Sequence, residues 1–177
     1  MRRLITRIMS MMVENYITFP LVYFASAIIK RNMPKIGIVV PLSRGLYLLA
    51  MSHGPKFFVH KKAWSFALEI FANNVYERFF KVEKGDYVFD IGAHVGVFTI
   101  KAAKAVASNG LVVAVEPDPK ALALLRLNVE INRLDNVIIV NKAIFSREGR
   151  ATLYIWPDSG GSNLNMRKTS NYVEVET

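Results

Sequence analysis

The sequence predicts an α/β protein built around a parallel β-sheet. Three apolar runs, residues 87–91, 111–115 and 137–140, read as buried strands, and helical segments separate them along the chain. This alternation is typical of a parallel sheet, because parallel neighbours need a long crossover connection. With 52% hydrophobic and 21% charged residues, the 177-residue chain also has the composition of a globular protein.

The two crossover helices are marked by their ends. The first is expected from Val95 to Ala107, where the sequence is rich in alanine and stops at Ser108-Asn109-Gly110. The second is expected from Pro119 to Asn132. Asp118 is its expected N-cap, because proline favours the first helical position and an aspartate before it can accept a helix N–H.

Short strands and one helix are expected before this sheet. Residues 36–40, 46–51 and 57–60 read as strands, with turns at Pro41–Gly45 and His53–Lys56. Between Ala63 and Lys81 the spacing predicts a helix that packs an apolar stripe on a core. The residues of this stripe are Trp64, Leu68, Phe71, Val75 and Phe79.

After Arg150 the hydrophobic pattern changes to period two. The runs "ATLYIW" and "YVEVET" alternate as antiparallel strands do, and the polar loop "DSGGSNLN" (Asp158 to Asn165) lies between them. That loop is either a flexible turn or a loop that faces substrate or cofactor.

The first 35 residues form a basic, apolar arm. Its apolar run, Tyr16 to Ile29, is shorter than the roughly 20 residues that span a bilayer, and it contains Pro20. Three interpretations stay open: a helix packed on the protein, an interfacial helix, and a signal peptide cut near Ala25-Ser26-Ala27. We expect a cytoplasmic protein, with residues 1–35 as a candidate peripheral membrane contact.

The net charge of +9 comes from 23 Lys and Arg against 14 Asp and Glu. It suits an anionic partner, but no basic stripe interleaved with aromatic residues follows the arm, so no nucleic-acid partner is expected. The chain has no cysteine, which excludes disulfides and zinc–thiolate sites. No metal is expected, because His53, His60 and His94 lack the spacing of a metal site.

The stretch "VFDIGAHVGVFTI", Val88 to Ile100, predicts a ligand site at the carboxyl end of the first parallel strand. Asp90 precedes two glycines: Gly92 allows a tight turn, and Gly96 lets the helix pack against the strand. Glu116 follows the second strand, where a carboxylate can accept hydrogen bonds from both hydroxyls of a ribose.

Three nucleotide-like ligands compete for this site. A nucleoside triphosphate needs lysine and a hydroxyl residue after the last glycine, where the chain has Val97 and Phe98. A dinucleotide needs glycine where His94 stands, and Asp90 would repel its pyrophosphate. S-adenosylmethionine carries a sulfonium and an amino group, which suit an acid beside the turn. A dinucleotide-dependent oxidoreductase remains the lesser alternative.

Three segments together resemble the FkbM family of class I S-adenosylmethionine-dependent methyltransferases: "VFDIGAHVGVFTIKAA", "VVAVEPDPKALALLRLNVEINRLDNV" and "NKAIFSREGRATLY". The resemblance covers about Tyr76 to Thr177. It implies a partial class I methyltransferase (Rossmann-like) parallel sheet with an N-terminal helical arm and a β extension. Residues 1–62 would be the arm and short strands, and residues 63–177 an incomplete S-adenosylmethionine-binding domain.

The same resemblance implies the roles of the site residues. The methionine end of the cofactor would lie against the loop, Glu116 would bind the ribose, and residues 141–143 would border the adenine. The cofactor-binding set is then Asp90, Gly92, Ala93, His94, Gly96, Glu116, Asn141 and Ala143. The family commonly has asparagine where this chain has His94, so His94 is either a cofactor neighbour or a loop-packing residue.

Two residues just before the site, Tyr76 and Glu77, lie near it in the family pattern, but we expect a structural role for both.

The expected function is S-adenosylmethionine-dependent methyl transfer, as O-methylation of a sugar or small-molecule hydroxyl. In the family the acceptor side is built after the fourth strand, and only three parallel strands are expected here, so the chain reads as truncated before that half. We therefore assign no catalytic base. The alternative from another class is a non-catalytic remnant held at a membrane surface by residues 1–35.

Overall fold

The fold was taken from a computed structural model. It describes residues 36–43, 45–51, 54–60, 75–78, 80–155 and 170–177, together with Ala63, Ala67, Ile70, Phe71 and Leu164. The N-terminal arm, residues 1–35, and the loop Asp158 to Asn165 apart from Leu164 lie outside these residues, so the predictions made for them stay predictions.

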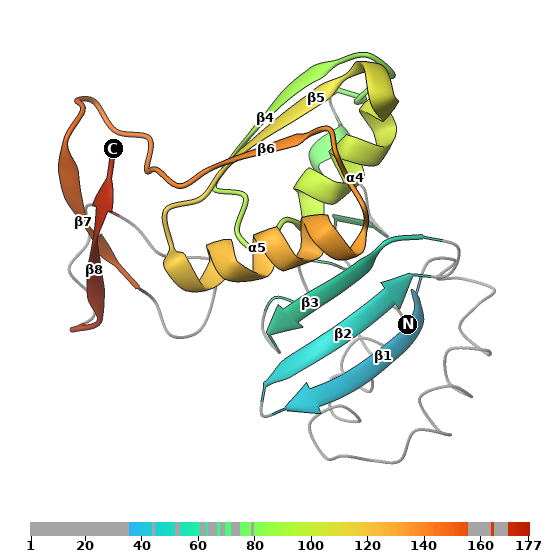
Figure 1. The fold of residues 1–177 in the computed structure, drawn as a ribbon, viewed down its shortest axis with the longest axis horizontal. Coiled ribbons are helices and arrows are strands. Elements are labelled where there is room, and N and C mark those ends of the chain that lie inside the picture. The colour runs from blue at the N-terminus through green and yellow to red at the C-terminus, as the bar shows by residue number, and fades with distance from the viewer. Residues whose placement is uncertain are drawn as a thin grey trace.

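The predicted parallel sheet is present, in the order β4-β5-β6. Its strands are β4 (Tyr87–Ile91), β5 (Leu111–Val115) and β6 (Val137–Val140). They pair in parallel, with Tyr87 opposite Leu111 and Val112 opposite Val137. Helix α4 (Val97–Val106), followed by the short 3-10 helix η2 (Ala107–Asn109), connects the first pair, and helix α5 (Pro119–Ile131) connects the second. The predicted α/β fold of the Rossmann-like type is thereby confirmed (Figure 1).

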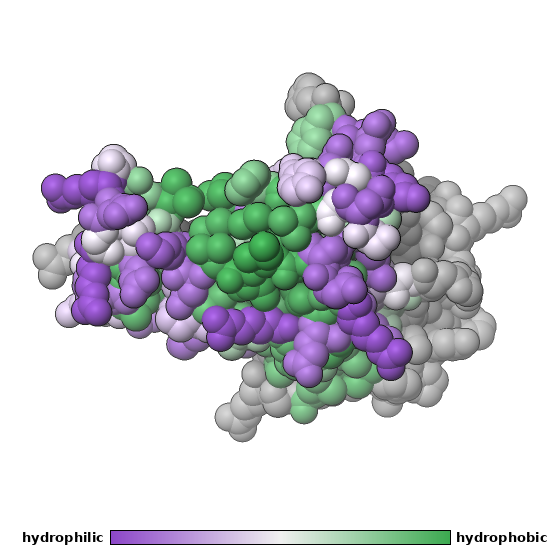
Figure 2. All heavy atoms as spheres, turned by 45° about the horizontal axis from the view of Figure 1, so that its top comes forward, coloured by the Kyte–Doolittle hydropathy of each residue, from purple (hydrophilic) through white to green (hydrophobic). Residues whose placement is uncertain are grey.

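One face of this sheet is more exposed than the sequence predicts. Strand β4 was expected to be buried, but Tyr87, Phe89 and Ile91 are 75%, 70% and 56% exposed, and Ile138 of β6 is 50% exposed. The apolar clusters of α4 and α5 form on the opposite face, so alternate residues of β4 turn away from them. Figure 2 shows an apolar area on this side of the molecule.

A second sheet of three antiparallel strands comes earlier in the chain. Its strands, β1 (Ile36–Ser43), β2 (Leu46–Met51) and β3 (Lys56–His60), follow one another in space. The predicted turn at Pro41–Gly45 is too long, because Pro41 pairs with Tyr47 and Ser43 with Leu46. The ladder therefore extends almost to Gly45, whose φ of 80° closes the hairpin.

Helix α5 lies between the two sheets (Figure 1). Its Leu122 and Leu125 pack with Ala114 of β5, and its asparagines hydrogen-bond to β3. The core under β2 and β3 also contains Val97 and Ile100 of α4. This cluster joins residues on both sides of residue 62, and the division into two parts there stays a prediction.

The predicted helix after β3 is described in part. Ala63, Ala67, Ile70 and Phe71 are helical and buried against β2 and β3. Val75, which begins the 3-10 helix η1 (Val75–Arg78), is partly buried in the same cluster. Phe71 and Val75 agree with the expected stripe, whereas Trp64, Leu68 and Phe79 lie outside the described residues.

The β extension is a two-stranded antiparallel ribbon. Strand β7 (Arg150–Tyr154) pairs with β8 (Tyr172–Glu176), as the alternating sequence predicts. Ala143, Leu153 and Val175 form its small core. Among the described residues, no helix is long and apolar enough to cross a membrane. The cytoplasmic location stays a prediction.

The end of α4 is joined tightly to β4 and β5. The carbonyl of Asp86 accepts the Leu111 N–H at 3.0 Å, and Asn136 donates to the carbonyls of Ala103 and Ala107 at 2.8 Å each. The two bonds from Asn136 satisfy carbonyl groups at the end of the helical segment that have no partner within it. Gly110 is buried in this junction, and a Cβ there would lie 2.6 Å from the Asp86 carbonyl oxygen and 2.5 Å from the Val106 Cβ.

We expect Gly110→Ala to lower the free energy of unfolding by about 1 to 3 kcal/mol, because the backbone at Asp86 would have to move. Urea unfolding followed by circular dichroism measures the loss. Ser108→Ala, at an exposed position two residues earlier, is the control and should change the free energy by less than about 0.5 kcal/mol. Equal stability of the two variants would contradict the prediction.

Candidate functional site

The loop between β4 and α4 is a tight turn fixed to the end of β5. The N–H groups of Gly92 and Ala93 both donate to the carbonyl of Val115, at 2.9 and 3.0 Å. Gly92, His94 and Gly96 have φ values of 76°, 53° and 84°, in the left-handed region that favours glycine. The loop therefore doubles back at the carboxyl end of the sheet, where the sequence predicts a ligand site.

Gly96 allows this loop to approach α5. A Cβ at Gly96 would lie 2.4 Å from the Leu125 Cδ1 of α5. The sequence predicts that this glycine lets its helix pack against the strand, whereas the neighbour that a Cβ would meet is Leu125 of α5.

Glu116 is buried, with 5% of its surface exposed, directly after β5. Its Oε2 accepts the His94 N–H at 2.7 Å, and its Oε1 accepts the Asp118 N–H at 2.8 Å. Burial raises the pKa of Glu116, and these two hydrogen bonds lower it in part. Because each carboxylate oxygen has two lone pairs, Glu116 can still accept bonds from a ligand.

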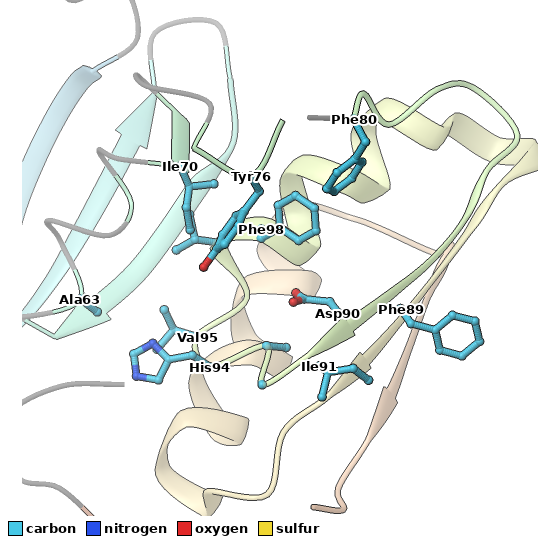
Figure 3. Close-up of a pocket in the computed structure, with 13 residues that line it drawn as sticks. Ala63, Ile70, Tyr76, Phe80, Phe89, Asp90, Ile91, His94, Val95 and Phe98 are labelled. Atoms are coloured by element: carbon cyan, nitrogen blue, oxygen red, sulfur yellow. The ribbon is translucent and has the colours of Figure 1, made fainter. Parts of the chain in front are cut away.

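Asp90 is the penultimate residue of β4, and its carboxyl group points into the cavity in Figure 3. The Thr99 hydroxyl, in the first turn of α4, donates to Asp90 Oδ2, and the Thr99 backbone N–H also bonds to this carboxyl. Burial raises the pKa of Asp90, and both Thr99 bonds oppose that rise. The carboxyl group of Asp90 is therefore fixed in position by Thr99 and partly removed from solvent.

A cavity of about 430 Å³ lies between the loop and a group of aromatic side chains (Figure 3). Asp90, Gly92, Ala93 and His94 line one side, and the aromatic residues lie opposite. These aromatic residues are Tyr76, Phe80 and Phe98, whereas Phe89, which also lines the cavity, lies on β4 next to Asp90 and points away from them in Figure 3. This volume lies in the range of small-molecule sites, and its one anionic group suits a cationic ligand. S-adenosylmethionine, which carries a sulfonium and an amino group, fits a cavity with this lining.

His94 lines the same cavity, and its backbone is anchored by Glu116. Burial lowers the pKa of its imidazole, which favours the neutral ring at pH 7. In Figure 3 the ring lies on the side of Ala63 rather than beside Asp90. Whether it contacts the cofactor or packs the loop stays open, as in the sequence prediction.

The predicted adenine-side residues lie apart from this cavity. Asn141 follows β6 and is exposed. Ala143 is buried in the ribbon cluster with Leu153 and Val175, and its N–H donates to the Glu176 carbonyl at 2.8 Å. Neither is among the residues that line the cavity. Of the predicted set, Asp90, Gly92, Ala93 and His94 line it, whereas Gly96 does not and Glu116 is joined to the loop only through its bond from the His94 N–H.

The neighbouring residues have mixed roles. Glu77 forms an ion pair with Lys101 of α4, as its expected structural role requires. Tyr76 packs edge-on against Phe98, with ring centroids 5.1 Å apart, and it also lines the cavity. Asp118 accepts the Lys120 N–H at 2.8 Å, which confirms it as the N-cap of α5.

Thr99 and the aromatic side chains that line the cavity were not among the site residues predicted from the sequence. Thr99 is completely buried, a position that a threonine rarely takes without a partner. It stands in the first turn of the helix that follows the acid, so its spacing from Asp90 was a usable signal. Phe80 and Phe98 carry no signal of a site in the sequence, and only the fold shows that they line the cavity. Among the described residues, no group of three His, Cys, Asp or Glu side chains could hold a metal ion.

A family model for the TRM5/TYW2 methyltransferase domain matches residues 51–150. A curated protein of Saccharolobus solfataricus, named "Probable cobalt-precorrin-6B C(15)-methyltransferase (decarboxylating)", is 34% identical over 61 residues, which are 34% of this chain and 31% of that protein. The chain thus spans about a third of the curated relative that it matches.

Solved structures give partial matches. TYW2 of M. jannaschii in complex with AdoMet is 30% identical, with a TM-score of 0.41, over 57% of this chain and 45% of the other. A SAM-dependent methyltransferase from Aquifex aeolicus is 25% identical, with a TM-score of 0.36, over 46% of this chain and 41% of the other.

The family match corrects two predictions. It supports the class I S-adenosylmethionine-dependent methyltransferase and its cofactor, but it does not support the FkbM family within that class. The predicted partner, a small-molecule or glycan acceptor with no nucleic acid, is wrong, because TRM5/TYW2 proteins are tRNA methyltransferases. The chain has no basic stripe interleaved with aromatic residues after the arm, and the small-molecule acceptor was implied by the FkbM resemblance alone.

The matched region contains every residue of the candidate site. It includes β4, β5 and β6, both crossover helices, the cofactor loop and Glu116. It also covers more than half of the chain, with the Rossmann-like sheet at its centre. The chain belongs to the TRM5/TYW2 methyltransferase domain family and has the fold of class I S-adenosylmethionine-dependent methyltransferases.

Proposed function

We propose that this protein binds S-adenosylmethionine in the cavity beside Asp90 and takes part in methyl transfer to an RNA acceptor, with tRNA as the first candidate. The observation that carries the proposal is a pair of carboxyl groups, the half-buried Asp90 and the buried Glu116, fixed on either side of the glycine loop. Family membership and the net charge of +9, which favours a polyanionic partner, support the acceptor class.

In this proposal Asp90 binds the positively charged methionine end of the cofactor, and Glu116 accepts hydrogen bonds from the ribose. Gly92 leaves open space beside the loop, since a Cβ there would meet no atom within 4 Å. The cofactor supplies an electrophilic methyl group on its sulfonium, and the chain binds and orients it. We assign no catalytic base. The contacts of His94, Asn141 and Ala143 with the cofactor stay predictions.

Removing the charge of Asp90 tests the cofactor site. We expect Asp90→Asn to weaken S-adenosylmethionine binding about ten- to a hundredfold, because hydrogen bonds to a charged partner are among the stronger ones. Isothermal titration calorimetry measures the dissociation constant. Asp135→Asn, which removes the same charge at an exposed position before β6, should bind as the unmodified protein does. Equal affinities of all three proteins would refute the site.

The pH dependence of binding gives an independent test. The pKa of Asp90 is raised above its ordinary 3.8, so its charge is lost at a higher pH than for a free aspartate. Affinity for the cationic cofactor should therefore be constant above that pKa and fall as the pH is lowered through it. Calorimetry from about pH 7 down to about pH 4 follows the change. The decline should be smaller in Asp90→Asn, and an identical decline in both proteins would exclude Asp90 as its source.

The acceptor is tested by methyl transfer from tritiated S-adenosylmethionine to unmodified tRNA transcripts. We expect label in the RNA fraction that ribonuclease releases. Total RNA is assayed alongside to detect other RNA acceptors, and protein without RNA is the control. Label in neither RNA, with cofactor binding intact, would favour the non-catalytic remnant over the methyltransferase.

A further inference from the structure

Asn128 is a completely buried polar side chain in the middle of α5, and no step of the proposed function uses it. Its Oδ1 accepts the N–H of Phe58 in β3 at 2.6 Å, and its Nδ2 donates to the Phe58 carbonyl at 2.9 Å. The same Nδ2 donates to the carbonyl of Val95, in the cofactor loop, at 2.8 Å. One amide therefore connects three parts of the chain.

The Val95 carbonyl needs this partner because of how α4 begins. The first helical bond of α4 runs from the Ile100 N–H to the Gly96 carbonyl, at 3.0 Å. The Thr99 N–H, which would reach the Val95 carbonyl if the helix began one residue earlier, bonds to the Asp90 carboxyl instead. A buried carbonyl without a hydrogen-bond partner is costly. The Asn128 amide supplies that partner to the Val95 carbonyl.

Asn132, the C-cap residue of α5, lies one turn further along the chain and provides a comparison. Its Oδ1 accepts the Lys56 N–H at 2.9 Å, and its Nδ2 donates to the Lys56 carbonyl at 2.6 Å. Both asparagines thus bind the backbone of β3 in the same manner. The Asn132 amide does not bond to the cofactor loop, and its third hydrogen bond goes to the Asn128 carbonyl at 2.7 Å. The bond to Val95 is what distinguishes Asn128 from a residue that only ties α5 to β3.

We propose that Asn128 is a positioning residue for the cofactor loop. By holding the Val95 carbonyl, it keeps the loop turned out of the helix, leaves the Thr99 N–H for Asp90, and so fixes the carboxyl group that faces the cavity. Leu125, one turn earlier on α5, packs against Gly96 of the same loop and supports it from the same side. The inference rests on the proposed function, since it gives Asn128 a role in cofactor binding.

The experiment compares Asn128→Ala with Asn132→Ala. We expect Asn128→Ala to bind S-adenosylmethionine about tenfold more weakly by calorimetry, and Asn132→Ala to bind as the unmodified protein does. Hydrogen exchange without cofactor, followed by mass spectrometry over residues 92–100, should be faster in Asn128→Ala only. This second readout does not depend on the cofactor. Thermal melts of each variant measure the general loss of stability.

Each outcome decides between a positioning and a purely structural role. Unchanged affinity and exchange in a folded Asn128→Ala would overturn the inference, while cofactor binding by the unmodified protein would leave the proposed function standing. Failure of the unmodified protein to bind S-adenosylmethionine would overturn the proposed function. Hydrogen exchange over residues 92–100 would still show whether Asn128 fixes the loop. If Asn128→Ala does not fold, Asn128→Ser is measured in its place. Failure of both, with Asn132→Ala folded, would assign Asn128 to stability alone.

Discussion

The buried carboxylate of Glu116 is the constraint on which the site depends. It accepts one backbone N–H from the loop after β4 and another from the segment after β5. Parallel strands end at the same edge of a sheet, but the sheet itself does not hydrogen-bond the loops that follow them to one another. Glu116 connects them with two hydrogen bonds to a charged acceptor, the stronger kind. Its side chain therefore builds the site before any ligand binds.

Helix α5 also contacts and supports the loop after β4. Leu125 occupies the space that a side chain at Gly96 would need, and the α5 amides hold the backbone of β3. The antiparallel sheet is thus attached to the parallel one through α5 and through the apolar cluster that includes Val95 and Ile100. A change in β3 would reach the cofactor loop through α5, because one helix serves both contacts.

Much of this was predictable from local sequence. The strands at 87–91, 111–115 and 137–140, the N-cap at Asp118 and the loop of Asp90 to Gly96 each carry a short-range signal in residue type and spacing. The separation of Ala143 from the cavity was not predictable, because it depends on pairing with Glu176, far along the chain. The exposure of Phe89 was missed for a similar reason: an apolar strand has the same composition whether one face or both are covered.

The two carboxyl groups of the site make its unliganded form costly at neutral pH. Burial raises the pKa of both, and the charges of Asp118 and Asp90 raise the pKa of Glu116 further. A carboxyl group whose folded pKa lies above its unfolded value stabilises the fold at low pH, and this contribution is lost as the pH rises through the folded pKa. A cation in the cavity would reverse that trend, since it favours the charged forms. A cationic cofactor would therefore stabilise the fold more at neutral pH than in acid, and its binding energy would offset a cost that the site itself creates.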